Sequence, residues 1–236
     1  IVNTELVLAD LQTVDGRLPQ AEKAAKTDPK LKAVFGAMSE AKQFLETGQP
    51  LFKQGKEWRI KNQDYLKDLF LLTMKPVIYA FNVDEKALQG ATLKAELTDL
   101  VKPAPALFIS AKLENELRGL SEDDRKELLS SYGQAESGLI QLVRSAYETL
   151  GLQSFLTAGN AEVRAWTIPS GATAPQAAGA IHTDFERGFI AAQVVNYEDL
   201  VKAGSLAEAR AAGLVRTEGK DYVMKPNDVV EFKFNV

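Results

Sequence analysis

The sequence predicts an α/β protein in two parts, and three patterns carry that prediction. Apolar residues alternate at spacings of three and four through most of residues 1–47, as in paired helices. Two short apolar runs, 76–82 and 106–109, each end in polar residues, as buried parallel strands do. Residues 163–195 then read as strand, turn, helix, loop and strand. We expect residues 1–151 to be the later part of a doubly wound domain and residues 152–236 to be a β-grasp, ubiquitin-like domain.

Composition narrows the functional class. The 236 residues are 45% apolar and 25% charged, without Cys and with a net charge of −4. The absence of Cys excludes disulfides and thiol chemistry. The negative balance argues against broad nucleic-acid affinity, so we expect no DNA partner, and no apolar run is long enough to predict a membrane span. These features favour a cytoplasmic protein, and the start at Ile1 within a helical pattern suggests a fragment.

Residues 1–48 are predicted to form an antiparallel helical hairpin. Thr27-Asp28-Pro29 is the turn, with Asp28 as N-cap and Pro29 opening the second helix, which ends at Gly48. Two readings remain open, a structural hairpin packed on its own domain and a projecting arm that contacts a partner. The apolar seam consists of Val7, Leu11, Val14, Leu18, Ala21 and Ala25 in the first helix and Leu31, Val34, Met38, Ala41 and Leu45 in the second.

The region after the hairpin is predicted to alternate between loops, helices and strands. Residues 49–62 are expected to be a loop in which basic residues surround Trp58, and residues 64–72 a helix. The strand at 76–82 is followed by a helix to about Leu100 and by the second strand, 106–109. Helices at 121–131 and 136–150 complete the first part, separated at Tyr132-Gly133.

The second part begins with a β-rich pattern. Val163–Ile168 reads as a strand that Pro169, Ser170 and Gly171 terminate. Thr173 is the predicted cap of a short helix, and residues 189–195 are the next strand.

Polar residues at two strand ends carry the predicted chemistry. The first group is Asn82-Val83-Asp84-Glu85 and the second is Ser110-Ala111-Lys112. Ligands of doubly wound sheets bind at the carboxyl ends of the strands, so the two groups should share one site. The plainer reading is that both are polar strand ends that cap the following helices.

Much of the chain resembles the YchF/Obg-like ATPases, P-loop NTPases related to translation factors. The resemblance rests on Trp166-Thr-Ile, on Ala174-Pro-Gln-Ala-Ala-Gly179, on Ile181-His-Thr-Asp-Phe-Glu-Arg-Gly-Phe-Ile190 and on the closing Asp228–Val236. It identifies residues 152–236 as a TGS domain. It also implies that residues 1–48 are a hairpin inserted in the nucleotide-binding domain.

The resemblance implies that Asn82, Val83 and Glu85, with Ser110, Ala111 and Lys112, bind the nucleotide base. Guanine-reading relatives have Asn-Lys-x-Asp at the first position, whereas Val and Glu here match the variant associated with ATP. ATP, or GTP, and Mg²⁺ are therefore the implied cofactors of the intact protein. The Gly-x-x-x-x-Gly-Lys-Ser/Thr motif is absent from the sequence. We expect no catalytic residue and no metal site here, and no hydrolysis by this chain alone.

Association with ribosomes is the implied partnership. Four lysines surround the hairpin turn and are candidate contacts to ribosomal RNA phosphates, namely Lys23, Lys26, Lys30 and Lys32. Simple solubility of an exposed tip is the alternative. The only His, His182, is expected to serve structure or a partner contact. The rival function for the whole chain is a noncatalytic module that binds RNA or protein.

Overall fold

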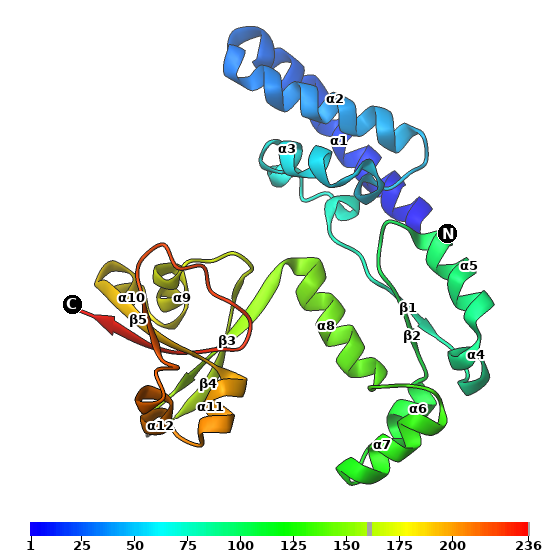
Figure 1. The fold of residues 1–236 in the computed structure, drawn as a ribbon. Coiled ribbons are helices and arrows are strands. Elements are labelled where there is room, and N and C mark those ends of the chain that lie inside the picture. The colour runs from blue at the N-terminus through cyan, green and yellow to red at the C-terminus, as the bar shows by residue number, and fades with distance from the viewer. Residues whose placement is uncertain (160–161, 236) are drawn as a thin grey trace. The chain divides into compact units, whose positions relative to one another are not determined.

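The computed structural model describes residues 1–159 and 162–235. Contacts divide the chain into two compact units, Ile1–Ala146 and Tyr147–Val236, coloured from blue through green and from green to red in Figure 1. The division falls within α8, about one turn before the boundary expected at 151/152. The Tyr147 hydroxyl explains the difference, because it lies 3.0 Å from the Thr167 hydroxyl of the second unit. Asn160, Ala161 and Val236, which fall within the predicted TGS domain, lie outside the described residues.

The first unit contains eight α-helices, four short 3₁₀ helices and two strands among its described residues. The helices are α1 (Val2–Thr27), α2 (Lys32–Glu46), α3 (Lys56–Leu66), α4 (Glu85–Gln89), α5 (Ala91–Val101), α6 (Ala111–Glu116), α7 (Glu122–Ser131) and α8 (Gly138–Leu150), the last of which continues into the second unit. The strands are β1 (Tyr79–Asn82) and β2 (Ala106–Ile109).

Helices α1 and α2 form the predicted hairpin (Figure 1). Asp28 turns the chain, since its side chain accepts a hydrogen bond from the Lys30 amide at 2.9 Å and Pro29 opens a short 3₁₀ helix. Val14, Ala41 and Leu45 are almost completely buried in the seam. Leu31 is an exception, because it lies in the 3₁₀ turn and is 38% exposed.

The predicted loop at 49–62 is wrong, because helix α3 begins at Lys56. Its buried side is formed by Trp58, Asn62 and Leu66, at a helical spacing of four. The Trp58 indole donates to Glu40 of α2 at 2.7 Å, which fixes α3 to the hairpin. The basic residues around Trp58 therefore lie largely on a packed helix.

The helix predicted at 64–72 is also wrong. Helix α3 ends at Leu66, and Phe70 adopts a left-handed conformation with φ of 50°. Asp10 of α1 accepts hydrogen bonds from the Leu72 and Thr73 amides, each at 2.7 Å, and from the Thr73 hydroxyl at 2.6 Å. This buried carboxylate satisfies backbone amides that a helix would have bonded internally.

Strands β1 and β2 pair in parallel but are less buried than predicted. Their residues are half-buried or exposed, because only these two strands form the sheet among the described residues of the first unit. The strand expected at 76–82 begins at Tyr79. The helix expected to follow it divides at Gly90 into α4 and α5, and α6 appears where no helix was predicted.

The second unit is a mixed five-stranded sheet with helices on both faces. Its strands are β3 (Leu152–Ala158), β4 (Val163–Pro169), β5 (Phe189–Asn196), β6 (Arg216–Glu218) and β7 (Asp228–Phe234), in the order β4-β3-β7-β5-β6. Its helices are α9 (Ala174–Ile181), α10 (Thr183–Arg187), α11 (Tyr197–Ala203) and α12 (Leu206–Ala211). The predicted strands and the helix after Thr173 are present, whereas α10 was not expected.

Adjacent residues of β5 and of β7 belong to different buried clusters, because successive side chains of a strand point to opposite faces of the sheet. Val194 and Val230 belong to the core that includes residues of α9, whereas Val195 and Val229 belong to the core that includes residues of α11 and α12. The sheet is therefore buried on both faces.

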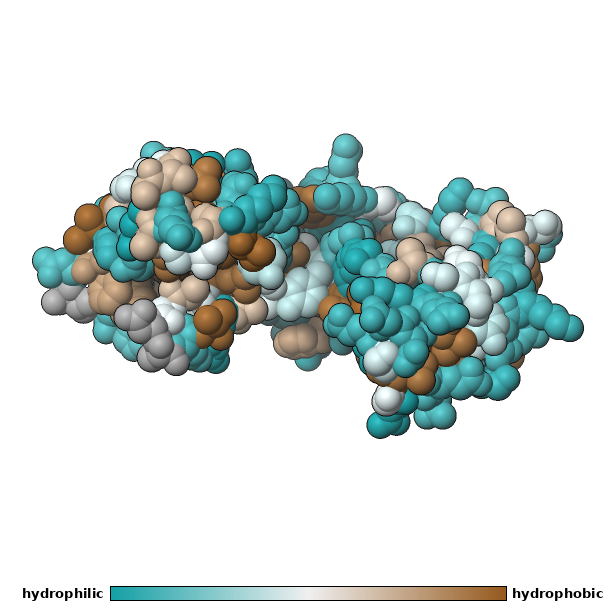
Figure 2. All heavy atoms as spheres, turned by 60° about the horizontal axis from the view of Figure 1, so that its bottom comes forward, coloured by the Kyte–Doolittle hydropathy of each residue, from teal (hydrophilic) through white to brown (hydrophobic). Residues whose placement is uncertain are grey.

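Hydrophilic residues predominate on the surface shown in Figure 2, with apolar residues scattered among them.

Candidate functional site

The two predicted motifs meet where β1 and β2 end. Their parallel register pairs Asn82 with Ile109. The Asn82 side-chain oxygen accepts a hydrogen bond from the Ala111 amide at 3.0 Å, and the Val83 amide donates to the Ile109 carbonyl at 2.8 Å. One motif is thus bonded directly to the other, as expected for polar residues that end neighbouring parallel strands.

Each motif also begins a helix. Asp84 accepts a hydrogen bond from the Ala87 amide at 2.8 Å and caps α4. The buried Ser110 accepts one from the Leu113 amide at 3.3 Å and caps α6. Local sequence explains both turns, because Asp and Ser are favoured N-cap residues. The capping role foreseen in the plainer reading therefore belongs to Asp84 and Ser110, whereas Asn82 links the two strands.

An ion pair closes the same edge. The Lys112 ammonium lies 2.8 Å from a Glu85 carboxylate oxygen and 3.9 Å from Glu116. The hydrogen bond from Lys112 holds the pKa of Glu85 below its ordinary value, and Glu85 in turn raises the pKa of Lys112. Both groups are therefore charged at neutral pH. The edge presents a carboxylate, an ammonium and an amide side chain within two short segments, a set able to recognise the hydrogen-bonding edge of a base.

Aromatic residues support this edge from within the two strands. The Phe81 and Phe108 rings stack with their centroids 5.3 Å apart, and the Lys94 ammonium lies 5.7 Å from the centre of the Phe108 ring. These contacts tie β1, β2 and α5 together. The position of Lys94 was not predicted, because it depends on how α5 packs against β2.

The four predicted lysine contacts lie at the hairpin turn. Lys23 and Lys26 are in the last part of α1, Lys30 is in the 3₁₀ turn, and Lys32 begins α2; all four are exposed. Lys26 pairs with Glu22 at 2.8 Å and thereby lowers the pKa of that carboxylate. Among the described residues, the other three have no carboxylate within 4.0 Å. The tip is therefore a positively charged patch separate from the strand-end site.

In the second unit, His182 has a structural contact. Its Nδ1 accepts a hydrogen bond from the Asp184 amide at 3.2 Å and caps α10. The described residues contain no cluster of three or more metal-binding side chains.

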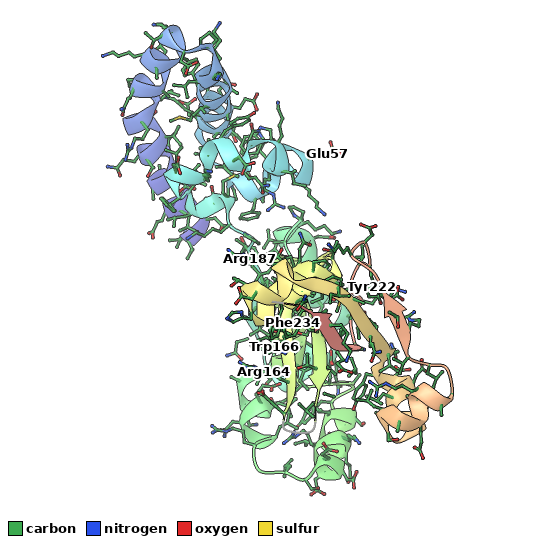
Figure 3. All side chains as sticks on the ribbon, turned by 90° about the vertical axis from the view of Figure 1, so that its left-hand side faces the viewer. Glu57, Arg164, Trp166, Arg187, Tyr222 and Phe234 are labelled. Carbon is green, nitrogen blue, oxygen red and sulfur yellow. The ribbon has the colours of Figure 1, made fainter. Side chains whose placement is uncertain are left out.

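The contact between Arg164 and Trp166 was not predicted from the sequence. The Arg164 guanidinium lies 4.2 Å from the centre of the Trp166 ring (Figure 3). Their spacing of two residues on a strand, which places both on one face, was the available indication.

Comparison with known proteins places these features in a family. A family model described as YchF-GTPase_C, protein of unknown function (DUF933), matches residues 152–235. The ribosome-binding ATPase YchF of Bacillus subtilis (strain 168) is 41% identical over 242 residues, covering 100% of this chain and 65% of the relative. The chain belongs to the YchF/Obg-like ATPase family.

Further relatives extend this relationship. The ribosome-binding ATPase YchF of Escherichia coli O157:H7 is 38% identical, covering 100% of this chain and 65% of the relative. Obg-like ATPase 1 of Caenorhabditis elegans is 36% identical, covering 100% and 61%. The chain thus spans less than two thirds of the length of these YchF and Obg-like relatives.

Solved structures support the fold. The Schizosaccharomyces pombe YchF GTPase matches with a TM-score of 0.83 at 31% identity, covering 99% of this chain and 64% of that one. A GTP-binding protein from Pyrococcus horikoshii OT3 matches with a TM-score of 0.61 at 17% identity, covering 99% and 70%. The second similarity concerns the fold alone. The mixed α/β fold predicted from the sequence is thereby confirmed.

Proposed function

We propose that this chain forms the base-recognition edge and the C-terminal TGS domain of a ribosome-associated nucleotide hydrolase. The observation that carries the proposal is the hydrogen bond between Asn82 and the Ala111 amide. It joins two motifs that lie 29 residues apart and gives the Asn-x-x-Glu and Ser-Ala-Lys segments one shared edge. The naming of curated relatives as ribosome-binding ATPases supports the same function.

The residues at this edge favour adenine. Guanine presents two adjacent donors to a carboxylate, whereas adenine presents one amino donor beside an acceptor. Glu85 is paired with Lys112, so the edge offers both an acceptor and a donor. Val83 removes the long cation that guanine-reading relatives have at this position. ATP is therefore the proposed nucleotide, with GTP as the competing one.

Phosphate binding requires residues that this sequence does not contain. No Gly-x-x-x-x-Gly-Lys-Ser/Thr segment occurs in it, and such a segment supplies the backbone amides and hydroxyl that hold phosphates and Mg²⁺. In our proposal that element, together with Mg²⁺, belongs to the portion of the relatives' length that this chain does not span. The chain alone should therefore hydrolyse neither ATP nor GTP, and Mg²⁺-dependent turnover by it would contradict the proposal.

The second unit is the proposed TGS domain, of β-grasp type. Its support is the mixed sheet with the β3–β4 hairpin at one edge, helix α9 packed against β4 and β5, and the family match over residues 152–235. We assign it a docking role on the ribosome in the cytoplasm. No helix of the described residues is long and apolar enough to cross a bilayer.

Exchange of base preference tests the nucleotide assignment. The double variant Val83→Lys/Glu85→Asp is made in the intact gene product, in which we propose that a phosphate-binding segment accompanies this chain. We expect its ratio of ATP to GTP affinity to move toward GTP by about 1–3 kcal/mol, the range for one exchanged set of charged hydrogen bonds. Equilibrium binding of both nucleotides measures the ratio.

A matched control separates the site from a general change of charge. Thr92→Lys/Glu96→Asp makes the same change of charge at exposed positions of α5 and should leave the ratio unchanged. An unchanged ratio in the Val83/Glu85 variant would contradict base recognition at this edge. If the gene product also binds neither nucleotide but still binds ribosomes, the noncatalytic binding module is the better description.

A further inference from the structure

A polar hollow of about 320 Å³ lies at one end of the sheet in the second unit. It is formed where β5 ends, β6 begins and β7 begins, with the segment before β6 along one side. The polar residues that line it are Asn196, Asp199, Arg216, Lys225 and Asp228. Small-molecule sites typically measure about 300–1,000 Å³, so this hollow suits a small ligand.

Asp228 forms the rigid base of this hollow. It is 2% exposed, and its Oδ2 accepts hydrogen bonds from the Tyr222 hydroxyl at 2.8 Å and from the Lys225 amide at 2.9 Å. Burial and the bond to Asp228 raise the pKa of Tyr222 to about 12, so the hydroxyl remains a donor. Both of these hydrogen bonds end on Oδ2, which leaves Oδ1 as the acceptor for a ligand.

Arg216 is held beside this base. Its guanidinium donates to the Tyr222 hydroxyl at 3.3 Å and lies 5.9 Å from the centre of the Tyr222 ring, labelled in Figure 3. Its Nε also lies 3.5 Å from Glu218. These contacts fix a cation next to a buried carboxylate while leaving further guanidinium N–H groups available.

Two residues of opposite charge, Asp199 and Lys225, line the hollow without forming an ion pair with any described residue. Within the described residues, neither Asp199 nor Lys225 has an oppositely charged group within 4.0 Å. Each nevertheless lines the same hollow. These two unpaired charges join Asp228 and Arg216, so the lining of the hollow contains two carboxylates and two cations.

We propose that this hollow binds a free α-amino acid. The amino acid's ammonium would bind Asp199 and the Oδ1 of Asp228, and its carboxylate would bind Arg216 and Lys225. Paired recognition of both groups is what distinguishes a zwitterion from a simple anion or cation. The site lies wholly within the second unit, and its existence does not depend on the proposed nucleotide function.

The test uses the full 236-residue chain and each of the twenty standard amino acids. Binding is followed by backbone chemical shifts in two-dimensional NMR, and we expect at least one amino acid to saturate the shifts of Gly213 and Asn196 with a dissociation constant of about 1 mM or tighter. The variants Asp199→Asn and Lys225→Gln should each weaken binding by about tenfold or more, because each removes a charge-assisted contact. Both positions are partly or fully exposed, so the fold should survive.

Matched variants and simpler ligands separate the possible outcomes. Asp221→Asn and Lys202→Gln, exposed positions outside the hollow, should leave binding unchanged. Methylamine and acetate should bind at least about tenfold more weakly than the amino acid, since each makes half of the contacts. Failure of all twenty amino acids to give saturable shifts would overturn the proposal. Inorganic phosphate binding as well as the best amino acid, unaffected by Asp199→Asn, would also overturn it and indicate a plain anion site.

Discussion

At the scale of single residues, the Glu85–Lys112 pair determines the charge of the strand-end site. The carboxylate has a lowered pKa because Lys112 lies 2.8 Å away. A group with a lowered folded-state pKa stabilises the fold above its unfolded pKa, and this contribution is lost as the pH falls through the folded pKa. The pair therefore remains intact at neutral pH and is lost in acid, when Glu85 is protonated, and in strong alkali, when Lys112 loses its proton.

Removal of the lysine should reverse this pKa shift. In Lys112→Met we expect the pKa of Glu85 to rise toward its ordinary value, because the hydrogen bond and the opposite charge are both lost. Titration of the Glu85 side-chain carboxyl by ¹³C NMR measures the change. Lys86→Met, at an exposed position that forms no ion pair with any described residue, should leave the Glu85 pKa as it is. Equal titration of Glu85 in the parent and in Lys112→Met would show that Lys112 does not control it.

At the scale of elements, two of the three glycines of the helical hairpin have opposite backbone requirements. Gly16 lies within α1 with open space around the position of a Cβ atom, whereas Gly48 ends the second helix at φ of 76°. Alanine suits a helix interior better than glycine does, but it is strained at positive φ. The same substitution should therefore stabilise one position and destabilise the other.

Gly16→Ala should raise the free energy of unfolding by about 0.5–1 kcal/mol, and Gly48→Ala should lower it by about 1 kcal/mol. The transition of the first unit in urea denaturation, followed by far-UV circular dichroism, gives both values. Each variant serves as the control for the other, because the chemical change is identical. Stabilisation by Gly48→Ala would mean that the left-handed turn does not restrict this position.

The hairpin tip is the element on which ribosome binding can be tested in this chain. Changing Lys23, Lys26, Lys30 and Lys32 to Glu should weaken co-sedimentation with ribosomes and flatten its dependence on salt, since fewer counterions are released. The control changes the exposed Lys53, Lys61, Lys67 and Lys75 to Glu, which alters net charge equally but leaves the tip intact. If both variants lose binding to the same extent, the effect comes from overall charge and the lysines only keep the tip soluble.

At the scale of the whole molecule, the division into two compact units predicts how the chain unfolds. Calorimetry should resolve two transitions, because each unit has its own buried clusters. Gly188→Ala should lower only the transition of the second unit, since a Cβ atom there would lie 2.1 Å from the Asn235 carbonyl oxygen. Gly48→Ala should lower only the other. A single transition lowered by both variants would contradict independent unfolding.

Sequence predicted those parts of the fold that short-range patterns control. The Asp28 turn, the strand Ala106–Ile109 and the start of α9 after Thr173 depend on neighbouring residues, and all three are present. Helix α3 and the bend near Leu72 depend on distant partners. Glu40 binds Trp58 across 18 residues, and Asp10 binds the Leu72 amide across 62. No local pattern encodes such contacts.

The candidate site likewise has features that local sequence could predict and features that depend on distant contacts. The two polar strand ends were identifiable because a strand boundary is a local feature, and parallel pairing implied their proximity. The bond from Asn82 to Ala111 and the pairing of Glu85 with Lys112 depend on the register of β1 and β2. Their role in base binding stays a prediction.

The position of β7 has a consequence for the order in which the protein is made. In the sheet order β4-β3-β7-β5-β6, the central strand is β7, which follows the other four strands of this sheet in the sequence. It pairs in parallel with β3 and antiparallel with β5, so the earlier strands have no direct link between their two halves until Asp228–Phe234 is available. During vectorial synthesis, the β3–β4 hairpin and the β5–β6 pair are therefore made before β7. Until then, the edges of β3 and β5 that pair with β7 have no partner strand. The second unit can complete its sheet only once translation has passed Phe234, where β7 ends.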